Sequence, residues 1–324
     1  MKKINGNQTR KHAYLIMVHH NFKQLLFLIS LLDDVRNDIY LHIDKKIDKE
    51  AYTYIYIYNE IQKATFNSKI YFVDRIAVYW GHYSFIEAEY SLFKASSSNY
   101  EYSYYHLISG DDLPLVSQDA IHQFFNQHPN KLFLKKAEIT PTIYERVAFP
   151  YIFPRITERT SKSLFFRICY RIFRKLEKSV YRILKVDCFK KFGLELGKAS
   201  NWVSIDNRMV KIILENEELV KQIFEKSFCG DELFIPTLVN HYDLVEDVYY
   251  YEIVPNAMGE FQGHLRYINW WDGNPYVWTD SEKDKSELLL AKKNGHFFSR
   301  KFDCSRYPKS GEFVLKLIEQ DNFD

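Results

Sequence analysis

The first third of the sequence alternates short β-rich segments with longer segments of helical periodicity. The β-rich segments are AYLIMVH (13–19), DIYLHID (38–44), KIYFVD (69–74) and YYHLIS (104–109). Between them, apolar residues recur near helical spacing. One such segment, AYTYIYIYNEIQKA (51–64), also alternates as a strand does, and we expect a helix there because of its neighbours. Strand, helix and strand repeated in this way predict an α/β fold with a mostly parallel central sheet covered by helices on both faces.

Polar residues follow each of these predicted strands. In an open parallel sheet, ligands bind beyond the carboxyl ends of the strands. The positions that this rule indicates are His19 and His20, Asp44 and Lys45, Asp74 and Arg75, and Gly110, Asp111 and Asp112. The sequence therefore predicts a ligand site along this edge of the sheet.

The composition is that of a folded protein with a large core. Hydrophobic residues make up 46% of the 324 residues and aromatic residues 17%, while the net charge of +2 is too close to neutral for a partner bound by overall charge. The four cysteines form no CxxC pair, so they indicate neither a zinc site nor a disulfide framework. No segment reaches the ~18 apolar residues that a membrane span requires. We expect a reduced, cytoplasmic protein.

The middle of the chain is strongly basic. Residues 151–191 hold twelve Lys and Arg against three Asp and Glu, a balance of +9 that leaves −7 for the remainder. Apolar residues recur there every three or four positions, which predicts a basic amphipathic helix; they are Phe165, Ile168, Ile172, Leu176, Val180 and Ile183. This helix would either pack its apolar stripe on the domain or rest on anionic lipid headgroups. Nucleic acid is not the expected partner, because the aromatic residues lie in the apolar stripe rather than among the arginines.

Several well-known catalytic motifs are missing from the sequence. It contains no GxGxxG, GxxxxGK[ST], HExxH or GxSxG, so dinucleotide-binding, P-loop, zincin and α/β-hydrolase functions have no support. It also contains no Asp-x-Asp. Many nucleotide-sugar transferases with this type of sheet use such a pair to hold a divalent cation on the diphosphate.

Eight segments occur in one order along residues 13–303: AYLIMVHH, YLHIDKK, YWGHYSFIEAE, LISGDDLP, SNWVSID, GDELFIPTL, LRYINW and FFSRKFD. In this order the chain resembles the family of core 2 and I-branching β-1,6-N-acetylglucosaminyltransferases and peptide O-xylosyltransferases, which is glycosyltransferase family 14. Only the basic segment is unmatched. Each motif is weak alone, and the shared order carries the resemblance.

The resemblance implies one glycosyltransferase domain of GT-A type, a Rossmann-like nucleotide-sugar fold, over residues 1–324. Its nucleotide-sugar half would cover about 13–150, the basic helical insertion about 151–191, the acceptor and catalytic half about 192–303, and a C-terminal helix 304–324. The implied reaction is an inverting transfer of a sugar, such as xylose, N-acetylglucosamine or another hexose, from a UDP-sugar to an acceptor hydroxyl. It implies no metal cofactor, which fits the missing Asp-x-Asp.

The resemblance also implies how the departing diphosphate is neutralised. Without a metal, fixed protein cations have to meet the negative charge that builds up on the leaving group. By similarity, Lys301 in FFSRKFD and Arg266 in HLRYINW take this role, with Arg300 as a less certain neighbour. The alternative is that the basic pair is exposed and flanks buried Phe298 and Phe302.

A base is needed because the acceptor hydroxyl loses its proton as it attacks. Glu232 in GDELFIPTL occupies the place of the family's catalytic glutamate at the start of a helix. A helix N-terminus favours the charged form of a carboxylate. We expect Asp231 to cap that helix and Glu232 to act as the base; capping alone would explain both residues.

Five further positions carry over by resemblance, and three of them have a structural alternative. Asp44 and His19 would meet the nucleotide. The alternative for Asp44 is that it is a turn residue. Trp80 would lie near the donor sugar, Asp112 would contact a sugar, and Trp202 would lie on the acceptor side. The alternatives are a buried tryptophan at Trp80 and an Asx turn before Pro114 at Asp112.

The chain departs from the eukaryotic relatives, which have a membrane anchor, a stem and many disulfides. We therefore expect a bacterial enzyme of the cytoplasm, peripheral on the inner face of the membrane through residues 155–191. Its acceptor would be a growing polysaccharide, a glycolipid or another lipid-linked glycan. Two alternatives stay open: a metal-dependent transferase in which Asp111 and Asp112 hold the cation, and a basic binding protein without enzymatic activity.

Overall fold

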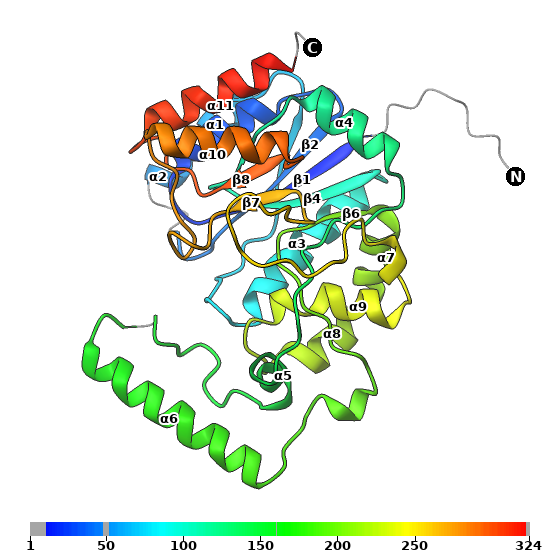
Figure 1. Cartoon of the computed structure of the whole chain (residues 1–324), viewed down its shortest axis with the longest axis vertical. Coiled ribbons are helices and arrows are strands. Elements are labelled where there is room, and N and C mark those ends of the chain that lie inside the picture. Colours follow the sequence, from blue (N-terminus) through cyan, green and yellow to red (C-terminus); the bar gives the residue numbers. More distant parts are fainter. Residues whose placement is uncertain (1–10, 48–51, 160, 322–324) are drawn as a thin grey trace, which may run out of the picture.

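A central sheet forms the middle layer of the molecule (Figure 1). The structure is a computed structural model and describes residues 11–47, 52–159 and 161–321. The strand order is β3-β2-β1-β4-β6, and all neighbours are parallel except β6, which is antiparallel to β4. The bounds are β1 (His12–Val18), β2 (Asn37–Ile43), β3 (Lys69–Phe72), β4 (Tyr104–Ser109) and β6 (Ser204–Asp206). The predicted α/β class with a mostly parallel sheet is confirmed.

Helices bury both faces of this sheet, so every residue of β1, β2 and β4 is buried. One face packs against α3 (Ser84–Asn99), α7 (Asn207–Glu215), α8 (Glu217–Phe224) and α9 (Phe234–His241). The other face packs against α1 (Phe22–Leu32), α4 (Gln118–Gln127), α10 (Glu282–Lys293) and α11 (Pro308–Gln320). The segment of ambiguous periodicity forms a helix, α2 (Tyr52–Lys63), as predicted.

A second, three-stranded sheet brings the C-terminal part of the chain to the end of β4. Its order is β5-β8-β7, with β5 (Leu113–Pro114), β8 (Phe298–Arg300) and β7 (Arg266–Ile268). Because β5 follows β4 almost directly, its pairing with β8 places Arg300 and the following residue beside the carboxyl end of the central sheet.

The GDELF segment does not begin a helix at Asp231. Instead, residues Gly230–Glu232 form a 3₁₀ turn, η2, closed by the bond from Leu233 N–H to the Gly230 carbonyl at 2.9 Å. The helix α9 begins only at Phe234, with Leu233 at its N-cap and no side-chain cap. The prediction that Asp231 caps this helix is therefore wrong, because the turn places Asp231 before the N-cap position.

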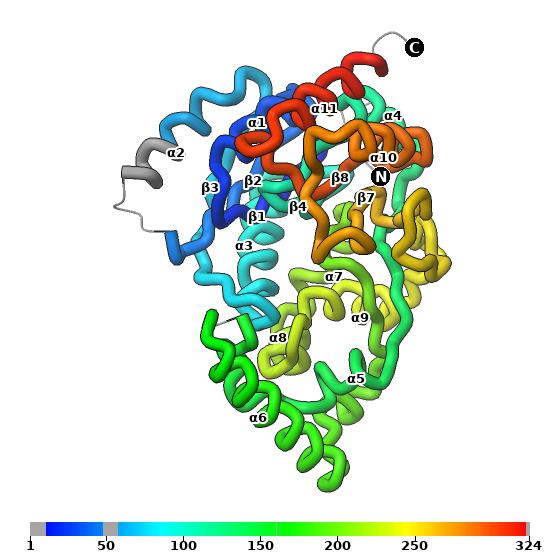
Figure 2. Tube along the Cα trace, turned by 60° about the vertical axis from the view of Figure 1, so that its left-hand side comes forward, coloured from blue at the N-terminus to red at the C-terminus, as the bar shows by residue number. Residues whose placement is uncertain are grey.

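The basic segment forms α6 (Leu164–Ile183), a helix at the edge of the molecule, far from both sheets (Figures 1 and 2). It follows α5 (Pro141–Ala148) and leads through a short 3₁₀ turn, η1 (Lys190–Phe192), towards β6. Another 3₁₀ turn, η3 (Val245–Asp247), follows α9. The predicted amphipathic helix is confirmed, but it does not pack its apolar stripe on the domain: its only buried residue is Glu177.

Candidate active site

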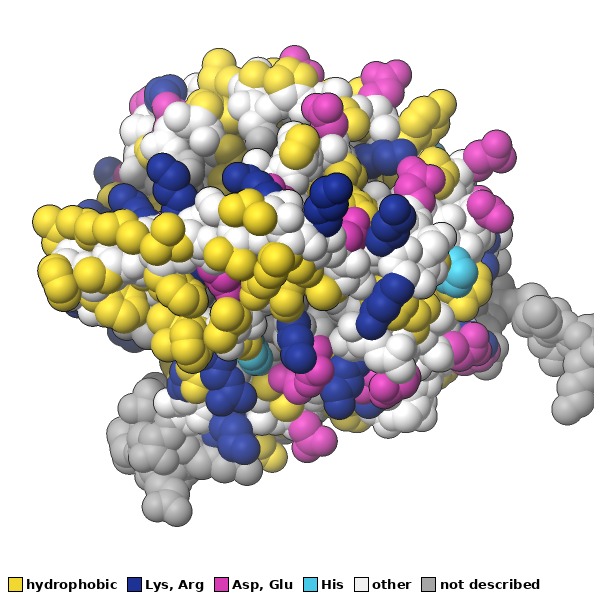
Figure 3. All heavy atoms as spheres, turned by 90° about the horizontal axis from the view of Figure 1, so that it is seen from below, with side chains coloured by type: hydrophobic (Ala, Val, Ile, Leu, Met, Phe, Trp, Pro, Cys, Tyr) yellow, Lys and Arg dark blue, Asp and Glu magenta, His cyan; other side chains and the backbone are white. Residues whose placement is uncertain are grey.

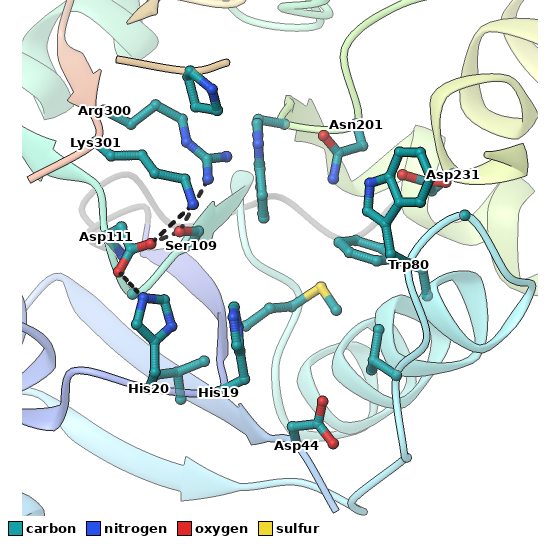
Figure 4. A pocket seen from close by; sticks show the side chains of 18 of the residues that line it. His19, His20, Asp44, Trp80, Ser109, Asp111, Asn201, Asp231, Arg300 and Lys301 are labelled. Atoms are coloured by element: carbon teal, nitrogen blue, oxygen red, sulfur yellow. Dashed lines mark hydrogen bonds and ion pairs between the residues drawn. The ribbon is translucent and has the colours of Figure 1, made fainter. Parts of the chain in front are cut away.

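A cavity of about 550 Å³ lies at the carboxyl ends of β1, β2 and β4 (Figure 4). His19 and His20 line it after β1, Asp44 after β2 and Asp111 after β4. This is the edge that the parallel-sheet rule predicts. Loops from the rest of the chain complete the wall, contributing Trp80, Arg159, Asn201, Trp202, Asp231, Glu232, Trp270, Arg300 and Lys301 among others.

Two cations from β8 and the residue after it form one side of the cavity. Arg300 Nη2 donates to Ser109 Oγ at 3.4 Å, and its Nε lies 3.3 Å from Asp112 Oδ1. Lys301 Nζ lies 3.4 Å from Asp111 Oδ2. The guanidinium of Arg300 also lies over the ring of Trp202, 4.5 Å from its centroid. Both cations are thus held in place before any ligand binds.

Arg266 does not belong to this cavity, and its predicted contact with the diphosphate is wrong. Its side chain is wholly buried, and it lies outside the residues that line the cavity. Its Nη2 donates to the Val203 carbonyl at 2.7 Å and to Ser204 Oγ at 3.0 Å. Burial lowers the pKa of Arg266 to about 9. The residue joins the small sheet to β6 of the central sheet.

Asp112 is also behind the cavity wall rather than in it. It is 1% exposed, and its Oδ2 accepts a hydrogen bond from the Ser109 backbone N–H at 3.2 Å. Burial raises its pKa, although Arg300 opposes that shift. The predicted sugar contact is therefore wrong, because Asp112 faces Arg300 and the chain turn instead of open space.

The two acidic residues after β4 are both engaged by protein cations. Asp111 lies between Lys301 and His20, whose Nε2 is 3.6 Å from Asp111 Oδ1, and Asp112 faces Arg300. Within residues 11–47, 52–159 and 161–321, no group of three or more His, Cys, Asp or Glu side chains is placed to hold a metal ion.

The ends of the neighbouring strands β1 and β2 hold His19 and Asp44. Asp44 Oδ1 accepts the backbone N–H of Lys46 at 2.9 Å, so the predicted turn role and the cavity position occur together. Burial, and then the charge of His20, lower the pKa of His19, which keeps its imidazole neutral near neutral pH. Asp44 and His19 offer a carboxylate and a neutral imidazole to a ligand.

The carboxylates of Asp231 and Glu232 lie in the cavity and have different environments. Glu232 Oε2 accepts hydrogen bonds from Arg146 Nη1 and Lys198 Nζ, both at 2.8 Å. Burial opposes its charged form, but Lys198 and Arg146 outweigh burial and lower the pKa of Glu232. Burial first, and then the charge of Glu232, raise the pKa of Asp231 to about 7. One carboxylate is thus held ionised while its neighbour titrates near neutral pH.

Sequence reasoning missed the two cations beside Glu232. Arg146 comes from α5, and Lys198 comes from the loop before β6. They are 86 and 34 residues from Glu232 along the chain. Neither belongs to a motif, so only the folded chain brings them together.

Two tryptophans line the cavity in different ways. Trp80 is 45% exposed, and Arg159 covers its ring with the guanidinium 3.9 Å from the centroid. Trp202 is 8% exposed beneath Arg300. Gly81, directly after Trp80, has a φ of +73°, and a Cβ there would lie 2.4 Å from the ring of Phe228. Both the turn and the close ring therefore require glycine at position 81.

Figure 4 shows how these groups are distributed, with Arg300 and Lys301 on one side and Trp80 and Asp231 on the other. Asp44 and His19 lie below them, at the ends of β2 and β1. The cavity thus has a cationic side and, opposite it, a side that carries both a carboxylate and an aromatic ring. Such a site could hold an anionic ligand while a carboxylate handles a proton.

Comparison with known proteins gives a relative and two distant structures. "Xylosyltransferase sqv-6" of Caenorhabditis briggsae is 24% identical over 284 residues, which cover 82% of this chain and 31% of the relative. The chain thus spans about a third of the length of that curated relative. Mouse xyloside xylosyltransferase 1 in its apo form has a TM-score of 0.34 at 9% identity, covering 74% of this chain and 85% of that one. The WbbM bifunctional glycosyltransferase apo structure has a TM-score of 0.40 at 10% identity, covering 96% and 50%.

The family comparison covers most of the chain. Residues 12–287 match the family model described as Core-2/I-Branching enzyme. They include the ends of β1, β2 and β4, the η2 carboxylates and the basic insertion. The chain therefore belongs to the Core-2/I-branching enzyme family.

Proposed function

We propose that the chain is a glycosyltransferase that moves a sugar from a UDP-sugar to an acceptor hydroxyl with inversion at the anomeric carbon. Family membership supports sugar transfer, and the relative named a xylosyltransferase supports the same class of reaction. The observation that carries the proposal is one cavity with Arg300 and Lys301 on one side and the Asp231–Glu232 pair on the other.

In this proposal Arg300 and Lys301 neutralise the UDP that leaves. When the bond between the anomeric carbon and the phosphate oxygen breaks, its electron pair stays on the diphosphate. A cation ~4 Å from a phosphate oxygen contributes about 4 kcal/mol at an effective dielectric of ~20. Two cations already fixed by Asp111, Asp112 and Ser109 need little rearrangement during the reaction, so no metal is required.

Glu232 is the proposed base. As the acceptor oxygen attacks the anomeric carbon, the hydroxyl proton passes to the Glu232 carboxylate. Its hydrogen bonds to Arg146 and Lys198 keep it ionised and fix its position. Asp231, which titrates near neutral pH beside it, would change the charge around the base according to pH.

The remaining cavity residues would position the two substrates. Asp44 and His19 would meet the uracil or ribose, Trp80 would lie near the donor sugar, and Trp202 would lie towards the acceptor. A growing bacterial polysaccharide or glycolipid is the proposed acceptor class, with the enzyme acting at the cytoplasmic face of the membrane. Of the helices that the structure describes, none is long and apolar enough to cross a membrane.

The test is a panel of sugar nucleotides assayed for slow donor hydrolysis, with and without excess chelator. We expect hydrolysis of one or more UDP-sugars at a rate that the chelator leaves unchanged. A rate abolished by chelator would favour a metal held at Asp111. Absence of both hydrolysis and UDP binding, measured by calorimetry, would reject the transferase function.

A further inference from the structure

The amphipathic helix α6 presents its apolar side to solvent and its polar side to the protein. Its single buried residue is Glu177, whereas Phe165 is 77% exposed and Ile183 is 78% exposed. A surface helix of a globular domain normally does the reverse and buries its apolar stripe. The outward orientation of the apolar stripe therefore indicates that an apolar partner outside this chain covers it.

Polar contacts fix this orientation. The Glu177 carboxylate accepts hydrogen bonds from the side chain of Arg174 and from the backbone N–H of Ile152, the latter at 3.3 Å. Glu145 on α5 accepts hydrogen bonds from Lys178 Nζ at 3.2 Å and from Arg182 Nε at 2.7 Å. Ion pairs with Glu145 hold α6 to α5, and the hydrogen bond to Glu177 holds it to residue 152, so the helix cannot turn its apolar stripe inwards without breaking these contacts.

The exposed apolar residues form one continuous surface, which we call the α6 surface. Figure 3 shows it as a ridge of hydrophobic side chains with Lys and Arg beside it. Its members, all more than a third exposed, are Ile152, Phe153, Leu164, Phe165, Ile168, Ile172, Leu176, Val180, Ile183 and Leu184. The basic residues that accompany it are Lys162, Arg167, Arg171, Lys175 and Lys185.

Charge decides which partner fits. The segment 151–191 has a local balance of +9, from twelve basic and three acidic residues. In a two-fold dimer built on this surface, the basic residues of one copy would lie against the same basic residues of the other copy. Their like charges would repel. An anionic lipid surface offers apolar acyl chains for the stripe and negative headgroups for the basic residues. The charges also exclude a membrane-spanning role for α6.

A strap of residues 152–159 connects the α6 surface to the cavity. Near one end, the ring of Phe153 packs against Phe173 of α6, with centroids 5.8 Å apart. Further along, the guanidinium of Arg155 lies 5.4 Å from the ring centroid of Tyr79, and that of Arg159 lies 3.9 Å from that of Trp80. Arg159 and Trp80 both line the cavity. A bilayer bound to α6 would therefore lie next to the cavity mouth.

We propose that the α6 surface docks on an anionic phospholipid bilayer, with α6 parallel to the membrane plane. Resting on the proposed function, this arrangement assigns the acceptor to glycans carried by membrane lipids, which would meet the donor sugar at Trp80. The donor, being water-soluble, would enter from the side away from the bilayer.

Vesicle flotation tests the docking step. The full chain is mixed with vesicles of phosphatidylcholine alone or with added phosphatidylglycerol. We expect flotation only with the anionic vesicles and its loss at high salt, because the charge attraction is screened. Equal flotation with both vesicle types, or with neither, would overturn the proposal.

Matched variants locate the contact. Phe165→Glu and Ile172→Glu place a negative charge in the stripe and should abolish flotation, while Phe66→Glu is the control, because Phe66 is 92% exposed and lies far from α6 in the sequence. Replacing Lys175 or Lys185 by Ala should weaken binding about fivefold each. Normal flotation of Phe165→Glu, or a dimer that this variant dissociates in sedimentation experiments, would contradict docking on lipid.

UDP binding separates this proposal from the proposed function. We expect Phe165→Glu to bind UDP as the unchanged chain does in a thermal-shift assay, which also shows that the variant is folded. If the unchanged chain floats with vesicles but neither hydrolyses a UDP-sugar nor binds UDP, the transferase function fails and docking stands. If it hydrolyses a UDP-sugar without vesicle binding, docking fails and the transferase function stands.

Discussion

Adjacent carboxylates with opposite environments are the main feature of the site at the scale of single residues. Glu232 bonds to Arg146 and Lys198, so its pKa is lowered, while burial and the charge of Glu232 raise the pKa of Asp231 to about 7. The sequence predicted a capping role for Asp231 because Asp before an apolar run is typical of an N-cap. The 3₁₀ turn removes that role and leaves Asp231 in the cavity.

Replacing each carboxylate by its amide should therefore have different effects. Glu232→Gln should bind UDP normally but lose transfer by about 10²–10⁴-fold, because the proton acceptor is removed. In the unchanged chain we expect the rate to rise as the pH passes through about 7, since ionised Asp231 adds negative charge beside the base and raises its proton affinity. Asp231→Asn should flatten that rise. Near-normal turnover of Glu232→Gln would exclude Glu232 as the base.

We expect Lys301 to contribute to the chemical step through its positive charge in the cavity. Lys301→Ala leaves Asp111 with one cation fewer and removes a positive charge from the cavity. We expect the transfer rate to fall by about 10²–10³-fold. Lys316→Ala on the exposed side of α11 is the control and should leave the rate unchanged. Equal rates for the two variants would show that Lys301 does not meet the leaving group.

At the scale of elements, the strands that the sequence predicted well are those buried on both faces. β1, β2 and β4 are rich in apolar residues and wholly buried, which is the pattern of a parallel sheet covered by helices. A strand, β7, also forms where the pattern LRYINW indicates one, but the pattern does not show which way Arg266 points. Its burial depends on the packing of the small sheet against β6, a contact between segments 62 residues apart. The residues around Glu232 were unpredictable for the same reason.

The attachment of α6 depends on one buried carboxylate. Glu177→Ala removes the partner of Arg174 and of the Ile152 N–H, and breaking a pair whose carboxylate is buried costs about 3–5 kcal/mol. We expect α6 to open locally and trypsin to cleave within it faster. Glu158→Ala is the matched control, because Glu158 pairs with Arg171 at the surface. If both variants resist trypsin as the unchanged chain does, Glu177 does not hold α6 in place.

At the scale of the whole molecule, buried neutral histidines make the fold sensitive to acid. Burial lowers the pKa of His42, His122 and His296 to about 4. His296 shows the constraint: its Nδ1–H donates to the Ala291 carbonyl, and its Nε2 accepts the Gln262 N–H. A protonated ring has no acceptor for that second bond.

The free energy of unfolding should depend on the protonation of these three histidines. Their folded pKa lies below the unfolded value of about 6.5, so their contribution is complete above about pH 6.5 and is lost as the pH falls towards 4. Denaturant titrations at several pH values should show this decrease, and His296→Gln should reduce its slope. His241→Gln, at an exposed position, is the control. A free energy of unfolding that stays constant between about pH 7 and 5 would contradict the assignment.

The pairing of β8 with β5 also has a consequence for biosynthesis. Arg300 and Lys301 come some two hundred residues after the strands and loops that form the floor of the cavity. A nascent chain whose β8 has not yet left the ribosome therefore carries the sheet edge without these two cations. The cavity gains its cationic side only when β8 has emerged and paired with β5.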